Sequence, residues 1–149
     1  MDRVEVVSAE PGGRPTELSI GALHIAAIGI PHEGWPDYHA DVENIVFSIT
    51  LDSQTTVAHM GDADPLTDHF TGSEAYWRLN HHHLVLPPYW FFLREQGRQV
   101  LSQIVDAEYA VGTHVPTKIP DEADSRPPEF EGFDLFTQPG EIRIIRPEP

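Results

Sequence analysis

Residues 44–51 alternate in polarity, and this alternation limits the folds that the chain can adopt. Side chains two positions apart on a β-strand point to the same face of a sheet. The expected strand carries Ile45, Phe47, Ile49 and Leu51 on one face and Val46, Ser48 and Thr50 on the other. After the turn at residues 52–54, residues 55–60 return to a β-type pattern, so residues 45–60 are predicted to form a β-hairpin.

The remaining pattern predicts an α/β fold, with strands and helices following one another along a single domain that spans residues 1–149. Further strands are expected within residues 18–31, 83–86, 109–113, 133–136 and 142–145. Helices are expected over residues 65–70, with Asp64 as N-cap, and over residues 94–105. The second helix should bury one stripe of side chains, made of Val100, Leu101, Ile104 and Val105.

The charge balance excludes several classes of partner. Nine Lys and Arg residues against 24 Asp and Glu residues give a formal net charge of −15, which argues against a nucleic acid or an anionic membrane surface. The absence of cysteine excludes disulfides and thiolate ligands, so any metal site must use His, Asp, Glu or water. The longest apolar stretch, residues 84–93, is too short to cross a bilayer, and a cytoplasmic location is expected.

Three residues of metal-binding type each follow a predicted strand: His32, Asp62 and His114. Ligands of open α/β sheets gather at the carboxyl ends of strands, and two imidazoles with one carboxylate suit zinc or iron. Gly61 is expected to leave room for the metal or its bound water. The alternative is that Gly61 and Asp62 form an ordinary turn and that the two histidines are solvated.

The other histidines are interpreted differently. His59 lies within a predicted strand and is expected to pack beside the ligands rather than to bind the metal. His81 and His83 share a side of an extended chain and could chelate, but they precede a strand, so a solvated edge is favoured for residues 81–83. Neither a Gly-x-Ser-x-Gly nucleophile motif nor a phosphate-binding loop is present, so no catalytic residue is assigned.

Taken in order, four segments resemble the C-terminal half of a metallo-β-lactamase-fold hydrolase, over roughly residues 15–145. The segments are IPHEG (30–34), VENIVFSITLDSQTTVAHMGDAD (42–64), LVLPPYWFFLREQGRQVL (84–101) and VGTHVP (111–116). The resemblance implies half of an αβ/βα sandwich, a mixed sheet with helices packed on its outer face. It also implies that His32 and His114 bind metals and that Asp62 bridges them.

In such hydrolases a dinuclear centre, most often zinc, with iron or manganese as alternatives, activates water against a small-molecule ester, amide, lactone or phosphoester. The family's His-x-His-x-Asp-His motif, with its general acid/base aspartate, is absent here. The resemblance therefore implies a missing N-terminal half, without which the chain is expected to be inactive. That half, or a second copy of the chain, should cover an apolar sheet face that includes Ile45, Phe47, Ile49 and Leu51. The alternative is a non-catalytic binding or assembly module.

Overall fold

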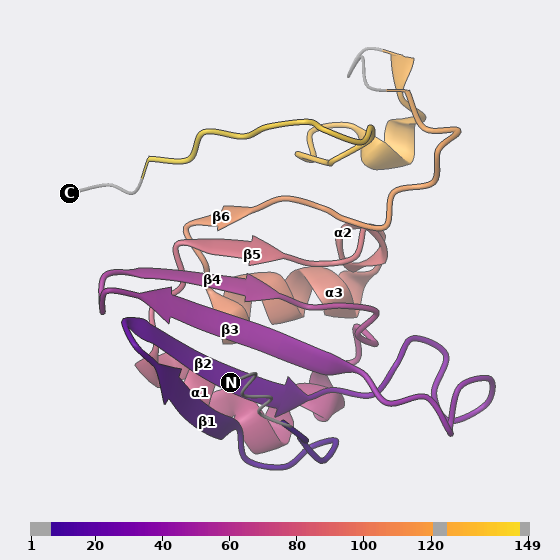
Figure 1. Ribbon diagram of the computed structural model, residues 1–149. Coiled ribbons are helices and arrows are strands. Elements are labelled where there is room, and N and C mark those ends of the chain that lie inside the picture. The colour runs from indigo at the N-terminus through magenta and orange to yellow at the C-terminus, as the bar shows by residue number, and fades with distance from the viewer. Residues whose placement is uncertain (1–6, 121–124, 147–149) are drawn as a thin grey trace.

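In the computed structural model, which describes residues 7–120 and 125–146, six strands form one mixed sheet in chain order (Figure 1). The strands are β1 (Thr16–Ile20), β2 (Leu23–Gly29), β3 (Ile45–Leu51), β4 (Thr55–His59), β5 (Leu84–Leu86) and β6 (Tyr109–Ala110). Strands β1 to β4 pair antiparallel, whereas β4, β5 and β6 pair parallel. As a result β2, β4, β5 and β6 run in one direction, and their carboxyl ends meet at one edge of the sheet.

Helices cover one face of this sheet, and α1 and α3 lie behind it in Figure 1. The helical elements are η1 (Thr67–Ser73), α1 (Glu74–Leu79), α2 (Trp90–Leu93), α3 (Glu95–Gln99), η2 (Val100–Val105) and η4 (Pro128–Phe130). The main core lies between the two layers. It combines Ala26, Ile28, Val46, Ala58, Met60 and Val85 from the sheet side with Phe70, Trp77, Phe91, Val100 and Val105 from the helical side.

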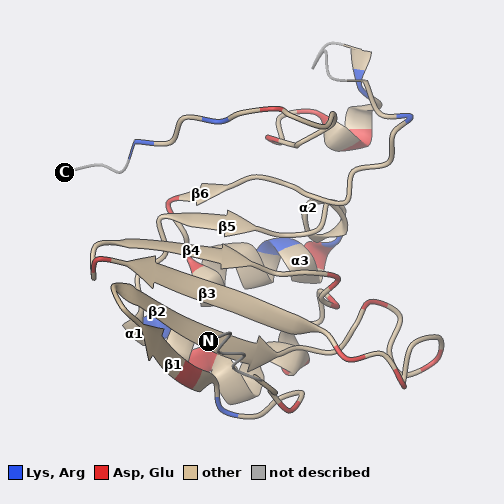
Figure 2. Cartoon of the chain, in the orientation of Figure 1, with Lys and Arg blue, Asp and Glu red and all other residues tan. Residues whose placement is uncertain are grey.

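The opposite face of the sheet, here called the open face, is apolar and exposed. Strand register places Ile20, Phe47, Ile49, Leu51 and Tyr109 on this face. Their exposed fractions lie between 38% and 51%. Apart from Glu17 in β1, the six strands carry no charged residue, and the acidic side chains lie mostly in loops and helices (Figure 2).

The α/β class and the β3–β4 hairpin are confirmed. The helix predicted over residues 94–105 is present as α3 continued by the π-helical turn η2. Of the side chains expected on the exposed sheet face, Phe47, Ile49 and Leu51 are exposed, while Ile45 is half-buried. Residues 18–31 contain the end of β1 and all of β2, because the chain reverses at Gly21, which has a φ of +60°.

Other expectations about the elements are wrong. Helix α1 was not predicted, and η1 begins at Thr67 rather than at Pro65. Asp64 caps no helix; its carboxylate instead accepts a hydrogen bond from the Leu66 N–H in the turn before η1. Residues 133–136 and 142–145 are not strands, although Leu135 makes one isolated bridge with Gly112. Within the described ranges, no helix is both long enough and apolar enough to cross a membrane.

Candidate metal centre

The structure brings His32, Asp62 and His114 together at the carboxyl edge of the sheet. His32 follows β2, Asp62 follows β4 and His114 follows β6. The Nε2 atom of His32 lies 3.5 Å from Oδ2 of Asp62. The Nδ1 atom of His114 lies 3.1 Å from Oδ1 of the same carboxylate. A nitrogen of each imidazole therefore lies near a different oxygen of Asp62.

These separations fit ligands that share a metal ion. Two ligand atoms that are each about 2.1 Å from a tetrahedral zinc lie about 3.4 Å apart. The nitrogen–oxygen distances of 3.5 Å and 3.1 Å lie on either side of this value. Each distance fits one pair of ligands, but His32, Asp62 and His114 do not form a group whose ligand atoms all lie within 4.8 Å of one another. Asp62 would therefore share one metal position with His32 and another with His114.

The hydrogen bonding of His32 leaves its Nε2 atom available to a cation. Its Nδ1 atom lies 2.9 Å from the backbone carbonyl of Glu33, which can only accept, so Nδ1 carries a proton. In neutral His32 the lone pair then lies on Nε2, the ring atom 3.5 Å from the Asp62 carboxylate. A proton on Nε2 or a metal ion between the two atoms would offset the repulsion between them.

Backbone hydrogen bonds hold the two loops that carry His32 and Asp62 against each other. The Glu33 N–H donates to the Asp62 carbonyl at 2.8 Å, and the Asp64 N–H donates to the Pro31 carbonyl at 2.8 Å. The Glu33 carboxylate also forms a two-pronged ion pair with Arg94, which anchors the loop after β2 to the start of α3. Side-chain and backbone contacts thus fix the approach of His32 to Asp62.

The local backbone accounts for the glycine at position 61. Its φ of +58° lies in the left-handed region that favours glycine, and a Cβ there would lie 2.4 Å from Oδ1 of Asn44. Glycine is therefore required by the backbone turn and by the Asn44 side chain, which packs directly against it. The prediction that Gly61 makes room for a metal is not needed to explain the residue.

His114 is held in a turn beside an aromatic wall. Its φ of +55° is uncommon for a residue other than glycine, and such conformations cost energy that the surrounding structure must supply. The His114 ring lies 5.9 Å from the Trp90 ring, centroid to centroid, and the Trp90 indole N–H donates to the Ala63 carbonyl. Trp90 thereby connects the segment that carries Asp62 with the segment that carries His114.

His59 lies close to the same group, but its ring is already engaged. Its Nδ1 atom accepts a hydrogen bond of 3.0 Å from the Gly61 N–H, which leaves the ring proton on Nε2. Burial lowers the pKa of His59, the neighbouring His114 lowers it further, and Asp62 partly opposes both effects. His59 is therefore a neutral imidazole that supports the turn before Asp62.

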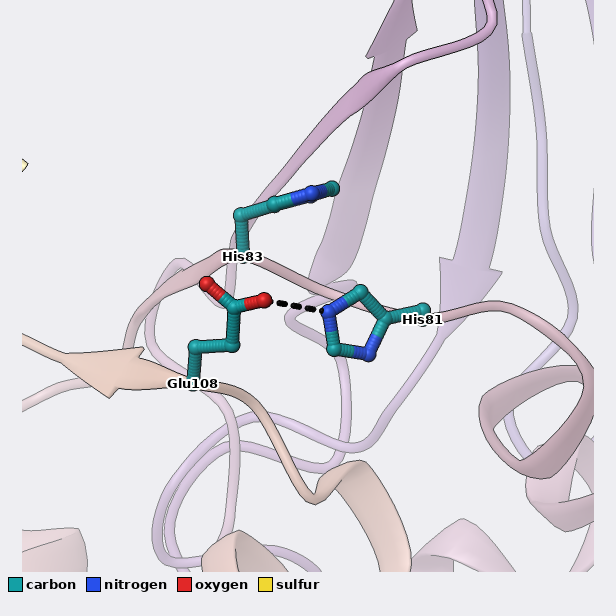
Figure 3. Close-up of side chains that lie close together, drawn as sticks. All are labelled: His81, His83 and Glu108. Atoms are coloured by element: carbon teal, nitrogen blue, oxygen red, sulfur yellow. Dashed lines mark hydrogen bonds and ion pairs between the residues drawn. The ribbon is translucent and has the colours of Figure 1, made fainter. Parts of the chain in front are cut away.

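A second group of potential ligands lies at the opposite edge of the sheet (Figure 3). One ligand atom from each of His81, His83 and Glu108 lies within 4.8 Å of the others. However, His81 Nε2 is already bound to the Glu108 carboxylate at 2.7 Å. His83 Nδ1 accepts the Thr56 N–H at 3.1 Å, so the ring proton lies on Nε2. A metal would have to break this hydrogen bond or remove that proton. Among the described residues, however, this is the group of three whose ligand atoms all converge, so it is a second candidate site.

The middle residue of this run, His82, departs from the expected solvated edge. Its side chain is fully buried, its ring lies 4.9 Å from the Trp77 ring, and its Nε2 atom lies 2.9 Å from the Ser48 hydroxyl. Burial, with smaller contributions from His81 and His83, lowers the pKa of His82 to about 4. The sequence signal for this burial is the alternation of side chains along an extended chain, which turns the middle imidazole away from its two neighbours.

The sequence interpretation missed Asn44, whose side chain contacts both loops of the candidate centre. An asparagine at the end of a polar loop gives no pattern of its own. Its position became visible only when β2, β3 and β4 were paired.

Comparison of the chain with protein-family models, with curated proteins and with solved structures yields no match, so this description of the site depends on the geometry of the chain itself.

Proposed function

We propose that His32, Asp62 and His114 hold a divalent metal ion, with zinc favoured over iron or manganese. We propose further that the chain is the C-terminal part of a metal-dependent hydrolase resembling the metallo-β-lactamase fold. The observation that supports this most is the Asp62 carboxylate, which offers one oxygen to each imidazole at distances expected of shared metal ligands.

In such a centre the metal lowers the pKa of a bound water toward neutrality and so supplies a nucleophile for ester, amide, lactone or phosphoester hydrolysis. The residues of this chain have more limited roles. The Glu33 carbonyl keeps the His32 proton on Nδ1, so that Nε2 is free to bind. Asp62 contributes negative charge, and Trp90 provides an apolar wall beside His114. The general acid/base would come from the N-terminal half that the resemblance implies.

The open face is evidence that a partner covers the sheet, and this partner is part of the same proposal. A sheet face that exposes Phe47, Ile49 and Leu51 without charged neighbours is unusual on the surface of a soluble monomer. It is typical of a surface that contacts another protein. A second sheet would cover it, either from the remainder of the hydrolase or from another copy of the chain. The same observation favours the second candidate function, a non-catalytic assembly module that keeps the fold without turnover.

Calorimetric titration of the metal-free chain with zinc tests the proposed centre. We expect saturable binding by the wild type, and at least about a tenfold loss of affinity in Asp62→Asn, since even residues beyond the ligands typically contribute that much. Asp62→Asn keeps the size of the side chain and removes its charge, so that the change reports on the carboxylate.

Asp52→Asn is the matched control, because Asp52 lies in the β3–β4 turn at the opposite edge of the sheet. His83→Ala tests the second group of histidines. Zinc binding that survives Asp62→Asn but is lost in His83→Ala would place the metal at the other edge. Equal binding by the wild type and Asp62→Asn would refute the proposed centre.

A further inference from the structure

Asn44 is a buried polar residue that lies between the two loops of the candidate centre. It directly precedes β3, and its exposed fraction is 8%. A buried amide must find hydrogen-bond partners, or its desolvation destabilises the fold. The partners of Asn44 show what its side chain does.

Within the described residues, the hydrogen-bond partners of the Asn44 amide all belong to the backbone just after β2 and β4. Its Nδ2 group donates to the carbonyls of Ile30 and Met60, each at 3.3 Å. Its Oδ1 atom accepts the Asp62 N–H at 2.8 Å. One side chain thus connects the segment that leads to His32 with the segment that carries Asp62.

From these contacts we infer that Asn44 is a positioning residue, which sets the separation and orientation of His32 and Asp62. The inference rests on the proposed metal centre for its functional meaning, although the positioning itself is independent of metal. The amide suits this task because it donates and accepts at once. An aspartate would offer only acceptors to the carbonyls of Ile30 and Met60.

Gly61 gives an independent sign of the same arrangement. A Cβ at position 61 would lie 2.4 Å from Oδ1 of Asn44 and 3.7 Å from the Ile45 carbonyl. The Asn44 side chain is therefore the neighbour that leaves least room for a side chain at position 61. Substitutions at the two positions should be coupled, since residues in direct contact do not act additively.

The test uses the full chain and two readouts, the imidazole NMR signals of His32 without metal and the zinc affinity. Asn44→Ala and Asn44→Asp are expected to move the His32 signals and to leave those of the distant His82 unchanged. Zinc affinity should fall by about 10- to 100-fold, the usual effect of removing a group that orients metal ligands. Gly61→Ala should lower the affinity less in the Asn44→Ala chain than in the wild type.

Asn80→Ala is the matched control, because Asn80 donates a similar hydrogen bond, of 2.8 Å, to the Tyr76 carbonyl at the end of α1. It should change neither readout. Asn44 variants that lose stability but keep the His32 signals would overturn the inference, whatever zinc does. If the wild type binds no zinc while the His32 signals still move in the Asn44 variants, the proposed centre fails and the positioning role stands.

Discussion

The role of each of these histidines depends on which of its two ring nitrogens is free. His32 donates through Nδ1 and keeps Nε2 open toward Asp62, whereas the Nδ1 atoms of His59 and His83 accept backbone N–H groups. The same residue type therefore acts as a candidate ligand in one place and as a support for a strand end in two others. The difference comes from local hydrogen bonds, which a sequence pattern does not contain.

Buried His82 should make the fold sensitive to acid. Its pKa is lowered from 6.5 to about 4 in the folded chain, so the unfolded chain takes up a proton first as the pH falls. The contribution of His82 is complete above about pH 6.5 and is lost as the pH falls toward 4. Over this interval the free energy of unfolding should fall by about 3 kcal/mol from this residue alone.

Urea unfolding at pH 7 and pH 5 measures this effect. His82→Gln keeps a polar group near the Ser48 hydroxyl but does not titrate, so its free energy of unfolding should change less between the two pH values. His24→Gln is a suitable control, because His24 lies at the exposed start of β2. An identical pH dependence in the wild type and His82→Gln would show that His82 is not the titrating group.

Among the elements, the sequence was most informative where the pattern is local and long. The alternation in β3 and the apolar stripe of α3 and η2 follow from a repeat within one segment, and both were predicted. Helix α1 was missed because its six residues, EAYWRL, are too short for a clear repeat, and its stability comes from buried Tyr76 and Trp77. The strand ends of the candidate centre were predictable, but the role of Asn44 depends on pairing between distant segments.

The contact between α2 and α3 depends on Gly97, a helical position where alanine normally stabilises by about 1 kcal/mol. Here a Cβ would lie 2.5 Å from both Cα and the carbonyl oxygen of Phe91. We therefore expect Gly97→Ala to destabilise the fold, by about 1–3 kcal/mol as in other overpacked sites.

Chemical unfolding of Gly97→Ala, with Gln103→Ala as a control on the exposed side of η2, measures this cost. The control should lie within about 0.5 kcal/mol of the wild type. A more stable Gly97→Ala chain would show that α2 and α3 do not pack as described.

At the scale of the whole molecule, the sheet has helices on one side and exposed apolar side chains on the other. We expect the isolated chain to bind a hydrophobic dye or to self-associate in sedimentation experiments. Ile49→Ser should reduce both, because Ile49 lies on β3 within the open face.

Leu79→Ser is the matched control for this surface. Leu79 is 79% exposed, but it lies at the end of α1, on the helical side of the sheet. Its substitution should leave dye binding and sedimentation unchanged. A monodisperse monomer that binds no dye would contradict the proposal that a second sheet covers the open face.

Anomalous X-ray diffraction from crystals grown with zinc would locate a metal held by Asp62 and the two imidazoles. We expect an anomalous peak about 2.1 Å from His32 Nε2 and Asp62 Oδ2, from His114 Nδ1 and Asp62 Oδ1, or one at each position. Zinc bound only by His81, His83 and Glu108, or no ordered zinc at the carboxyl edge of the sheet, would contradict the proposed centre.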